Sequence, residues 1–446
     1  MDESTAREPR PLEILSHGAN SRHDLPLDVL EGTPTELNNR GRSLQQHFKV
    51  TGNLADISTA IIYHRKALDL SNDDTNIPLF LDDLGYSLSL RFRHFDDDLD
   101  NITEAITQQQ KAVKLTPEGH DDLPLRLNNL GVLLALRFSQ SGDLSDISQA
   151  IANQEKAVHL TPDSHKNLPT YLCDLGTSLQ FRFDRLDETS DIVRAVEYHR
   201  KAIDIAQDDN PDLPILLIRL TTSLRYQWII STHLSDLLEA ITYGRKAVDI
   251  ASSGHAGLPF CLSVLGLCMA DRGVETGDLS SICDGVVYQE KVILLTPDGH
   301  AQKIRGLNNL GRTLVSRFAL TADQSDITEA ITCYRKAVKL TPKDHPQLCF
   351  RLSNLGEALQ RHFQRLGDIS DLSEAILFQE KVIQVAPQGN LDTLYFLSQL
   401  GRSLRLRFKE TQNISDLEKA TEHFRKVIQL CPDEHRLNKW VFLRSL

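Results

Sequence analysis

The sequence predicts an all-α solenoid, in which pairs of helices repeat along one axis. Two columns of residues in constant register carry this prediction. Lysines recur at intervals of 45 residues: Lys66, Lys111, Lys156, Lys201, Lys246, Lys291, Lys336, Lys381 and Lys426. Glycines run in step with them, and Thr221 takes the one remaining place: Gly41, Gly85, Gly131, Gly176, Gly266, Gly311, Gly356 and Gly401. A fixed period of this length indicates a repeat array, in which each unit buries its apolar face only against its neighbours.

The first helix of a repeat is clearest in the third copy. Leu127, Leu130, Leu134 and Phe138 recur at three- and four-residue steps, which is typical of an amphipathic helix. Pro124 lies in the first turn, where a missing N–H costs nothing. This helix is expected to end before the glycine-containing linker 139–144.

The second helix of the same copy is expected to begin at Ser145 and Asp146 and to end before Pro162. In other copies Asp236 and Asp326 stand three residues before a glutamate, as an N-cap with a reciprocal acidic partner does. The aspartate column to which they belong could pair with arginines six residues after each repeat glycine: Arg91, Arg137, Arg182, Arg272, Arg317 and Arg407. The alternative is a ladder of arginines for an acidic ligand.

The order Leu130-Gly131, Ala150, Lys156-Ala157 and Pro162 resembles the tetratricopeptide (TPR) repeat. The spacing from Ala157 to Pro162 matches that family, whereas the linker between the two helices is longer. This length is similar to the extended repeats of kinesin light chains. The phrase Asp-Ile-Ser-x-Ala-Ile is also similar to the repeat arrays of fungal CHAT-protease proteins. The resemblance implies a right-handed α-solenoid of TPR-like helix pairs with a concave groove for a protein ligand.

Domain organisation follows from this register. Residues 34–432 are expected to form nine TPR-like repeats. Residues 1–33 show no periodicity and are interpreted as a disordered or loosely packed leader. Residues 433–446 are interpreted as a partial tenth first helix or a capping helix, whose apolar end could support self-association. Copies five and six depart most from the pattern, with Thr221 in place of glycine. We attribute this departure to drift or a local bend, and the alternative is a binding hot spot.

The acidic composition narrows the range of partners. The chain of 446 residues has a formal net charge of −12, from 49 Lys+Arg and 61 Asp+Glu. A general nucleic-acid binder needs a basic stripe to displace phosphate counterions, so nucleic acid is not an expected partner. No apolar run approaches the length of a membrane span, and the start of the chain lacks the features of a signal peptide. The expected location is the cytoplasm, with the nucleus as the alternative.

Candidate ligand-binding residues lie on the first helices, next to the repeat glycine. An asparagine amide both donates and accepts hydrogen bonds, which suits a peptide backbone. The resemblance implies that this side of the helix lines the concave groove. We therefore expect peptide contacts from Asn38, Asn39, Asn128, Asn129, Asn308, Asn309 and Asn354, with Arg42, Arg312 and Arg402 selecting an acidic segment. The alternative is hydrogen bonding between neighbouring first helices.

The predicted function is a non-catalytic scaffold that binds an extended peptide or a partner helix in the concave groove. No motif for a catalytic site, a metal or a cofactor is present. Histidines three residues after the repeat proline, such as His120 and His165, are expected to make loop hydrogen bonds near the end of the second helix. Two alternatives remain open. The chain could be the regulatory region of a larger CHAT-type protease whose catalytic domain lies elsewhere, or a self-associating structural array.

Overall fold

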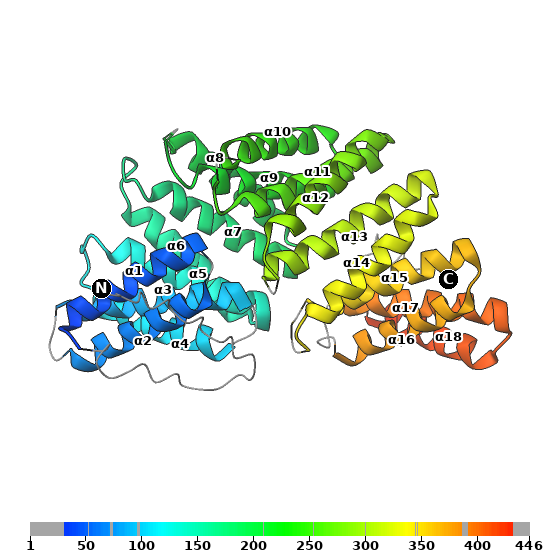
Figure 1. Ribbon diagram of the computed structural model, residues 1–446, viewed down its shortest axis with the longest axis horizontal. Coiled ribbons are helices and arrows are strands. Elements are labelled where there is room, and N and C mark those ends of the chain that lie inside the picture. The colour runs from blue at the N-terminus through cyan, green and yellow to red at the C-terminus, as the bar shows by residue number, and fades with distance from the viewer. Residues whose placement is uncertain are drawn as a thin grey trace, which may run out of the picture.

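The computed structural model describes residues 31–430, except positions 52, 72–74, 96–98, 208, 253, 299, 344, 346 and 386–390. Within these ranges eighteen α-helices form the fold, and no strand occurs (Figure 1). We number the repeats from 1 to 9, so that repeat 1 contains α1 and α2. The predicted segment 433–446 and nearly all of the predicted leader lie outside the described residues.

The odd-numbered helices are the first helices of the repeats. Their bounds are α1 (Pro34–Thr51), α3 (Ile77–Phe95), α5 (Leu123–Ser141), α7 (Leu168–Leu186), α9 (Leu213–Ser231), α11 (Leu258–Thr276), α13 (Ala301–Thr321), α15 (Leu348–Leu366) and α17 (Leu391–Thr411).

The even-numbered helices are the second helices. Their bounds are α2 (Leu54–Leu70), α4 (Leu99–Leu115), α6 (Leu144–Leu160), α8 (Thr189–Ile205), α10 (Leu234–Ala251), α12 (Leu279–Leu295), α14 (Gln324–Leu340), α16 (Ile369–Val385) and α18 (Ile414–Leu430). None of the helices in the described part of the chain has both the length and the apolar character to cross a bilayer.

The helices pack into one curved array. Each helix packs against its partner in the repeat and against the next helix, and the first helices also contact one another from repeat to repeat. In Figure 1 the array forms an arch, with α1–α6 at one end, α15–α18 at the other and α8–α12 across the top. Contact between α13 and α3 shows that the array curves back on itself. The predicted all-α solenoid of TPR-like helix pairs is therefore confirmed.

The N-caps of α10 and α14, His233 and Asp323, lie three residues before the predicted Asp236 and Asp326, whereas α6 begins at Leu144, one residue before the predicted Ser145. The N-cap of α6 is Asp143, whose carboxylate accepts from the Ser145 N–H at 2.9 Å. The N-cap of α14 is Asp323, whose carboxylate accepts from the Ser325 N–H in the same way. The prediction that Asp236 and Asp326 are the caps is wrong, because both lie inside their helices.

The repeat glycines let the two helices of a repeat approach closely. A Cβ at Gly131 on α5 would lie 2.5 Å from the Cγ of Gln154 on α6 and 2.9 Å from the Ala150 carbonyl oxygen. The side chain that fills this space belongs to a column on the second helices: His64, Gln109, Gln154, His199, Gln289, Tyr334, Gln379 and Phe424. Each glycine is therefore a close-packing position against a large side chain from α2, α4 and their equivalents.

A candidate ligand-binding cavity on the concave side

A cavity of about 600 Å³ opens between distant parts of the array. We call it the central cavity. Its lining comes mainly from α5 and α7 on one side and from α13 and α15 on the other, with contributions from α6, α9 and α11. Helices separated by more than a hundred residues of sequence meet here because the array is curved. This size falls within the usual range for ligand pockets, about 300–1,000 Å³.

The wall formed by α5 and α7 mixes apolar and polar side chains. Its residues are Val132, Ala135, Leu136 and Phe181 together with Ser139, Gln140, Asp174, Thr177 and Ser178. Opposite them, α13 and α15 contribute a polar and basic wall that includes Gln302, Arg305, Asn308, Asn309 and Gln347.

Arginine and phenylalanine side chains also line the cavity. Arg219 of α9 lies over the ring of Phe260 of α11, with 5.0 Å between the guanidinium carbon and the ring centroid. Arg351 of α15 is buried and donates to the Thr341 hydroxyl at 2.6 Å. Phe350, the residue before Arg351, also lines the cavity. The cavity thus has both positive groups and aromatic surface.

Gln154 of α6 also lines the cavity and is fully buried. Neither atom of its amide group has a hydrogen-bond partner. Two of its equivalents are bonded, since Gln109 donates to Asp82 at 2.6 Å and Gln289 donates to the Ser263 carbonyl at 2.7 Å, whereas the buried amide of Gln379 in repeat 8 has no hydrogen-bond partner either. A buried amide without partners costs free energy, so Gln154 has unused capacity for one donor and one acceptor contact.

The predicted asparagines connect neighbouring first helices. A side chain three residues before the glycine of one repeat bonds to the side chain two residues before the glycine of the next. We call these bonds the concave polar ladder. They join Asn38 to Asp83 at 2.6 Å, Asn129 to Asp82 at 2.9 Å, Asn128 to Asp174 at 2.8 Å, Asn309 to Ser263 at 3.0 Å and Asn354 to Asn308 at 3.0 Å.

The predicted asparagines differ in burial and in whether they line the central cavity. Asn38 and Asn128 are buried, whereas Asn39 is exposed. Asn308 and Asn309 also line the central cavity, so both are placed to reach a ligand there. Peptide contact by the whole predicted set stays a prediction.

The predicted arginines lie outside the residues that line the cavity. Arg42 pairs with Asp83 at 3.2 Å, and Arg312 pairs with Asp271 at 3.2 Å. Burial raises the pKa of Asp83 to about 6, although the Asn38 hydrogen bond and the Arg42 charge oppose this rise. Arg402 is half-buried, and its Nε has no hydrogen-bond partner. Their role in selecting an acidic segment likewise stays a prediction.

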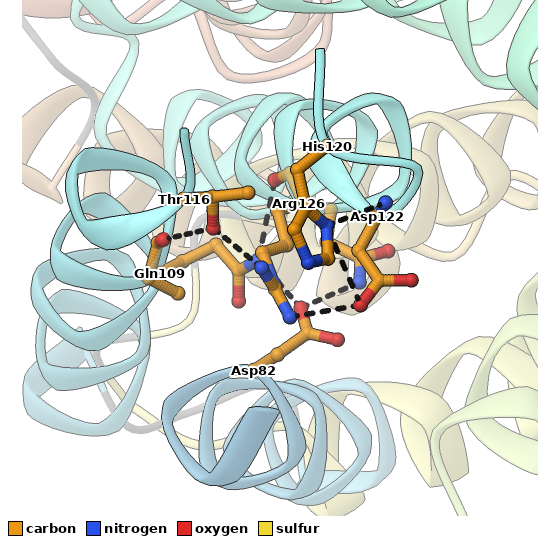
Figure 2. Close-up of polar contacts among 8 residues, drawn as sticks. Asp82, Gln109, Thr116, His120, Asp122 and Arg126 are labelled. Carbon is orange, nitrogen blue, oxygen red and sulfur yellow. Dashed lines mark hydrogen bonds and ion pairs between the residues drawn. The ribbon is translucent and has the colours of Figure 1, made fainter. Parts of the chain in front are cut away.

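Figure 2 shows how a second helix is tied to the next first helix. Arg126 is buried and donates to the Thr116 hydroxyl at 2.5 Å and to the Asp122 carboxylate at 3.0 Å. His120 accepts from the Asp122 N–H through Nδ1 at 3.1 Å. The same backbone bond recurs at His165, His255, His300 and His345. The histidines make loop hydrogen bonds as predicted, but at the start of the following helix rather than at the end of the preceding one.

The arginine and aspartate columns pair within repeats 3, 4, 7 and 9. Arg137 donates two hydrogen bonds to Asp146, at 2.7 and 2.6 Å, and these bonds raise the pKa of Arg137. The same two-bonded pair occurs between Arg182 and Asp191 and, with the same spacing, between Arg407 and Asp416. The first of the two alternatives for this column is the one observed.

Sequence reasoning missed the residues that give the cavity its character. Phe260, Arg305 and Phe350 stand six residues before the glycines of three successive repeats, so they form a column of large side chains that the sequence analysis did not single out. Phe181 lies at a position whose residue type varies from copy to copy. Their proximity depends on the curvature of the array, which the period does not reveal.

Comparison with known proteins supports the fold. The family model of the tetratricopeptide repeat matches residues 322–344. No curated protein matches the chain. Among solved structures, the human IFIT1 dimer with PPP-AAAA has a TM-score of 0.53 at 16% identity, covering 90% of this chain and 86% of that chain. A monomeric IFIT1 mutant with Gppp-AAAA has a TM-score of 0.51 at 13% identity, covering 89% and 86%.

These likenesses, at such low identity, concern the fold alone. The family match covers the whole of α14, which is a second helix of the array, and a few residues on either side of it. The finer resemblances to kinesin light chains and to CHAT-protease proteins stay predictions. Together with the eighteen paired helices, the comparisons confirm the resemblance read from the sequence, and the described chain is a tetratricopeptide-type helical repeat array.

Proposed function

We propose that this protein is a non-catalytic binding scaffold that holds an extended peptide or a partner helix on its concave side. The observation that carries the proposal is the central cavity, which the curvature of the array builds from helices of both ends. Solenoids of helix pairs commonly bind ligands on such concave surfaces. The partner contacts would come from the cavity walls and, where they reach the ligand, from the predicted asparagines and arginines.

The state of the cysteines fits a binding role better than a catalytic one. Burial raises the pKa of Cys173, Cys261 and Cys268 to about 12. Thiols held neutral in a core pack as small apolar groups, whereas a nucleophilic cysteine needs a lowered pKa.

Single-stranded RNA is the ligand that the comparison with IFIT1 brings into consideration, since two of its structures hold short RNA-like molecules. The acidic net charge of this chain weighs against nucleic acid as its partner. The regulatory region of a larger protease and the self-associating array remain alternative proposals.

A site-specific photocrosslinking experiment tests the proposal. The photoreactive residue p-benzoyl-phenylalanine replaces Phe350 in the cavity in one variant and Val193, half-exposed on the second helix α8, in the control. Both are irradiated in native extract. We expect protease-sensitive adducts from the cavity position that the control lacks.

Two results would contradict it. Adducts removed by ribonuclease, and not by protease, would make the ligand an RNA. Identical adducts from the Phe350 and Val193 variants would show that the cavity has no preference for a partner.

A further inference from the structure

The second helix α12 carries apolar side chains on the side that it turns to solvent. Leu294 is 83% exposed, the highest value among the large apolar side chains of the described residues, and Val287 is 45% exposed. Leu294 stands three residues after the repeat lysine of its helix. In the other eight repeats this place is polar, with Asp69, Lys114, His159, Asp204, Asp249, Lys339, Gln384 and Gln429. Repeat 6 thus exposes a leucine where every other repeat keeps a well-hydrated side chain.

Val287 and Leu294 border an open pocket of about 640 Å³ where α12 meets the first turn of α13. Ile293 completes its apolar part, and Glu290 lies between the apolar residues. We call the surface of Val287, Glu290, Ile293 and Leu294 the outer face of α12. At its rim the Lys303 ammonium pairs with the Asp298 carboxylate at 2.6 Å. Of the described residues that line the central cavity, none belongs to α12, so the two surfaces are distinct.

Neighbouring second helices are joined on their exposed side by ion pairs at a constant spacing of 39 residues. The residue before the repeat lysine of one repeat contacts a residue in the first half of the next second helix. The pairs are Arg65 with Glu104, Glu155 with Arg194, Arg200 with Glu239, and Arg335 with Glu374, at 2.5 to 2.9 Å. At the junction of repeats 6 and 7 alone, these two places hold like charges, Glu290 and Glu329.

The carboxylates of Glu290 and Glu329 act on one buried group. Burial raises the pKa of the Cys333 thiol to about 11, and the charges of Glu329 and Glu290 add to this rise, while Lys336 opposes it. Neither glutamate has an ion pair or a hydrogen bond within the described part of the chain. Repeat lysines such as Lys336 occur at every junction, so they do not replace the arginine that other junctions have in addition.

Two like charges cost little while water screens them. A partner that covers Val287 and Leu294 also removes water from Glu290, which lies between them, and an unpaired carboxylate is then costly. The apolar surface and the missing cation therefore make one joint demand on a partner, which must bring apolar side chains and a positive charge together.

We infer that the outer face of α12 binds an amphipathic helix of a partner protein, with a lysine or arginine between two apolar residues. Val287, Glu290 and Leu294 lie at i, i+3 and i+7, on one stripe of α12. A helix laid along this stripe matches its spacing, because the side chains of one helix pack between those of the other. Its cation serves Glu290 and Glu329 as arginine does at other junctions. An anionic membrane surface is disfavoured, since the two carboxylates repel it.

Selection from a library of helices tests this inference. A three-helix scaffold displayed on phage carries random residues on one helix face, and the library is first depleted on the double variant Glu290→Arg/Leu294→Asp. This variant gives α12 the outer residues of repeats 4 and 5, so we expect it to melt at or above the wild-type temperature. The remaining phage are selected on the wild type. Leu377→Asp, which removes another exposed leucine on α16, is the matched control.

We expect the selected helices to carry Leu, Ile or Phe seven residues apart, with Lys or Arg between them. They should bind Glu290→Arg and Leu294→Asp each at least about tenfold more weakly than the wild type, and Leu377→Asp equally well. The variant Glu290→Arg/Glu329→Arg should instead select helices with Asp or Glu between the apolar residues.

Three results would overturn the inference. The first is a library in which no helix survives depletion, or in which the survivors lack a cation between their apolar residues. The second is a wild-type protein that sediments as a dimer at micromolar concentration while Leu294→Asp is a monomer, which would assign the face to a second copy of this chain. The third is binding to phosphatidylserine vesicles that Leu294→Asp abolishes. The central cavity is tested separately, by photocrosslinking at Phe350.

Discussion

Repeats 4 and 5 are neighbours in the array, yet the small and the large residue at the crossing of their two helices have exchanged places. In repeat 4, Gly176 of α7 faces His199 of α8, and a Cβ on the glycine would lie 2.6 Å from the imidazole Nε2. In repeat 5, Thr221 of α9 takes the place of the glycine, and Gly244 of α10 takes the place of the histidine. A Cβ on Gly244 would lie 3.3 Å from the Thr221 methyl carbon.

The exchange shows that the crossing constrains the combined volume of the two residues rather than the identity of either one. Close-packed interiors tolerate substitutions that conserve volume and resist those that add to it. The departure of repeat 5 at Thr221 is therefore a compensated change, and drift alone does not describe it.

The two repeats also differ in how they hold the aspartate of the second helix. In repeat 4 the Asp191 carboxylate is buried, with 1% of the residue exposed, and accepts two hydrogen bonds from Arg182. In repeat 5 the residue at the arginine position is Gln227, and Asp236 accepts from the Ser231 hydroxyl at 2.7 Å instead. Asp236 is only partly buried, so it needs less compensation.

The largest effect is expected from breaking the ion pair of repeat 4. Arg182→Met leaves the Asp191 carboxylate buried without its cation, which should lower the free energy of unfolding by about 3 kcal/mol. The matched change in repeat 5, Gln227→Met, should cost under about 0.5 kcal/mol. Urea titrations followed by circular dichroism measure both. Equal losses would mean that the pair in repeat 4 contributes no more than a surface contact.

The next effect tests the volume exchange. Gly176→Thr places a residue of repeat 5 into repeat 4 and should cost about 2–3 kcal/mol, because the new side chain collides with His199. Adding His199→Gly recreates the arrangement of Thr221 and Gly244 and should recover part of that loss, as a positive coupling energy in a double-mutant cycle. Purely additive costs for the two changes would contradict the idea that the crossing conserves volume.

The same pair of repeats shows how far sequence reasoning reaches. The glycine column and the pairing of Arg182 with Asp191 could both be predicted, because each lies within one repeat and returns at a fixed interval. The exchange at Thr221 was misread, since its compensation at Gly244 lies on the other helix and appears only when the two columns are compared across space. Local periodicity therefore predicts the repeat. A departure from it can be interpreted only together with the residue that it contacts on the other helix.

The candidate site was less predictable than the fold. Asn308 and Asn309 were predicted from their chemistry, and both line the cavity, while their contact with a peptide stays a prediction. Gln154 was not predicted. It belongs to the column that packs on the repeat glycines, and the sequence does not show which members of that column lack hydrogen-bond partners. Phe181 and Arg305 approach a common cavity through the curvature of the array, which accumulates over many small rotations between repeats.

A pH-dependent difference between the repeats is expected from His199. Burial lowers the pKa of His199 to about 3, despite the opposing hydrogen bond to the Cys173 carbonyl. A folded-state pKa below the unfolded value means that stability is fully present above about pH 6.5 and falls as the pH drops toward 3. By pH 5 this group alone should remove about 2 kcal/mol.

His199→Gln, which introduces the residue found at the equivalent position of repeat 3, should abolish this part of the acid sensitivity. The measurement is the free energy of unfolding at pH 7 and at pH 5 for both proteins. An unchanged difference between the two pH values in the variant would show that His199 is already protonated, or is solvated, in the folded state.

The smallest effect concerns the ends of the first helices, where the two repeats agree in backbone and differ in side chain. Asp187 ends α7 at a φ of 58°, and Thr232 ends α9 at a φ of 57°. This left-handed conformation strains a β-branched residue more than an aspartate, and glycine adopts it freely. Repeat 3 has Gly142 at the same place, with a φ of 72°.

Thr232→Gly should therefore stabilise the protein by about 1 kcal/mol, and Asp187→Gly should stabilise it by less. The reverse change in repeat 3, Gly142→Thr, should cost about as much as Thr232→Gly gains. Melting temperatures of the three variants rank these effects directly. If Thr232→Gly were to melt below the wild type, the hydrogen bond from the Thr232 hydroxyl to the Ser231 carbonyl, at 2.7 Å, would outweigh the backbone strain.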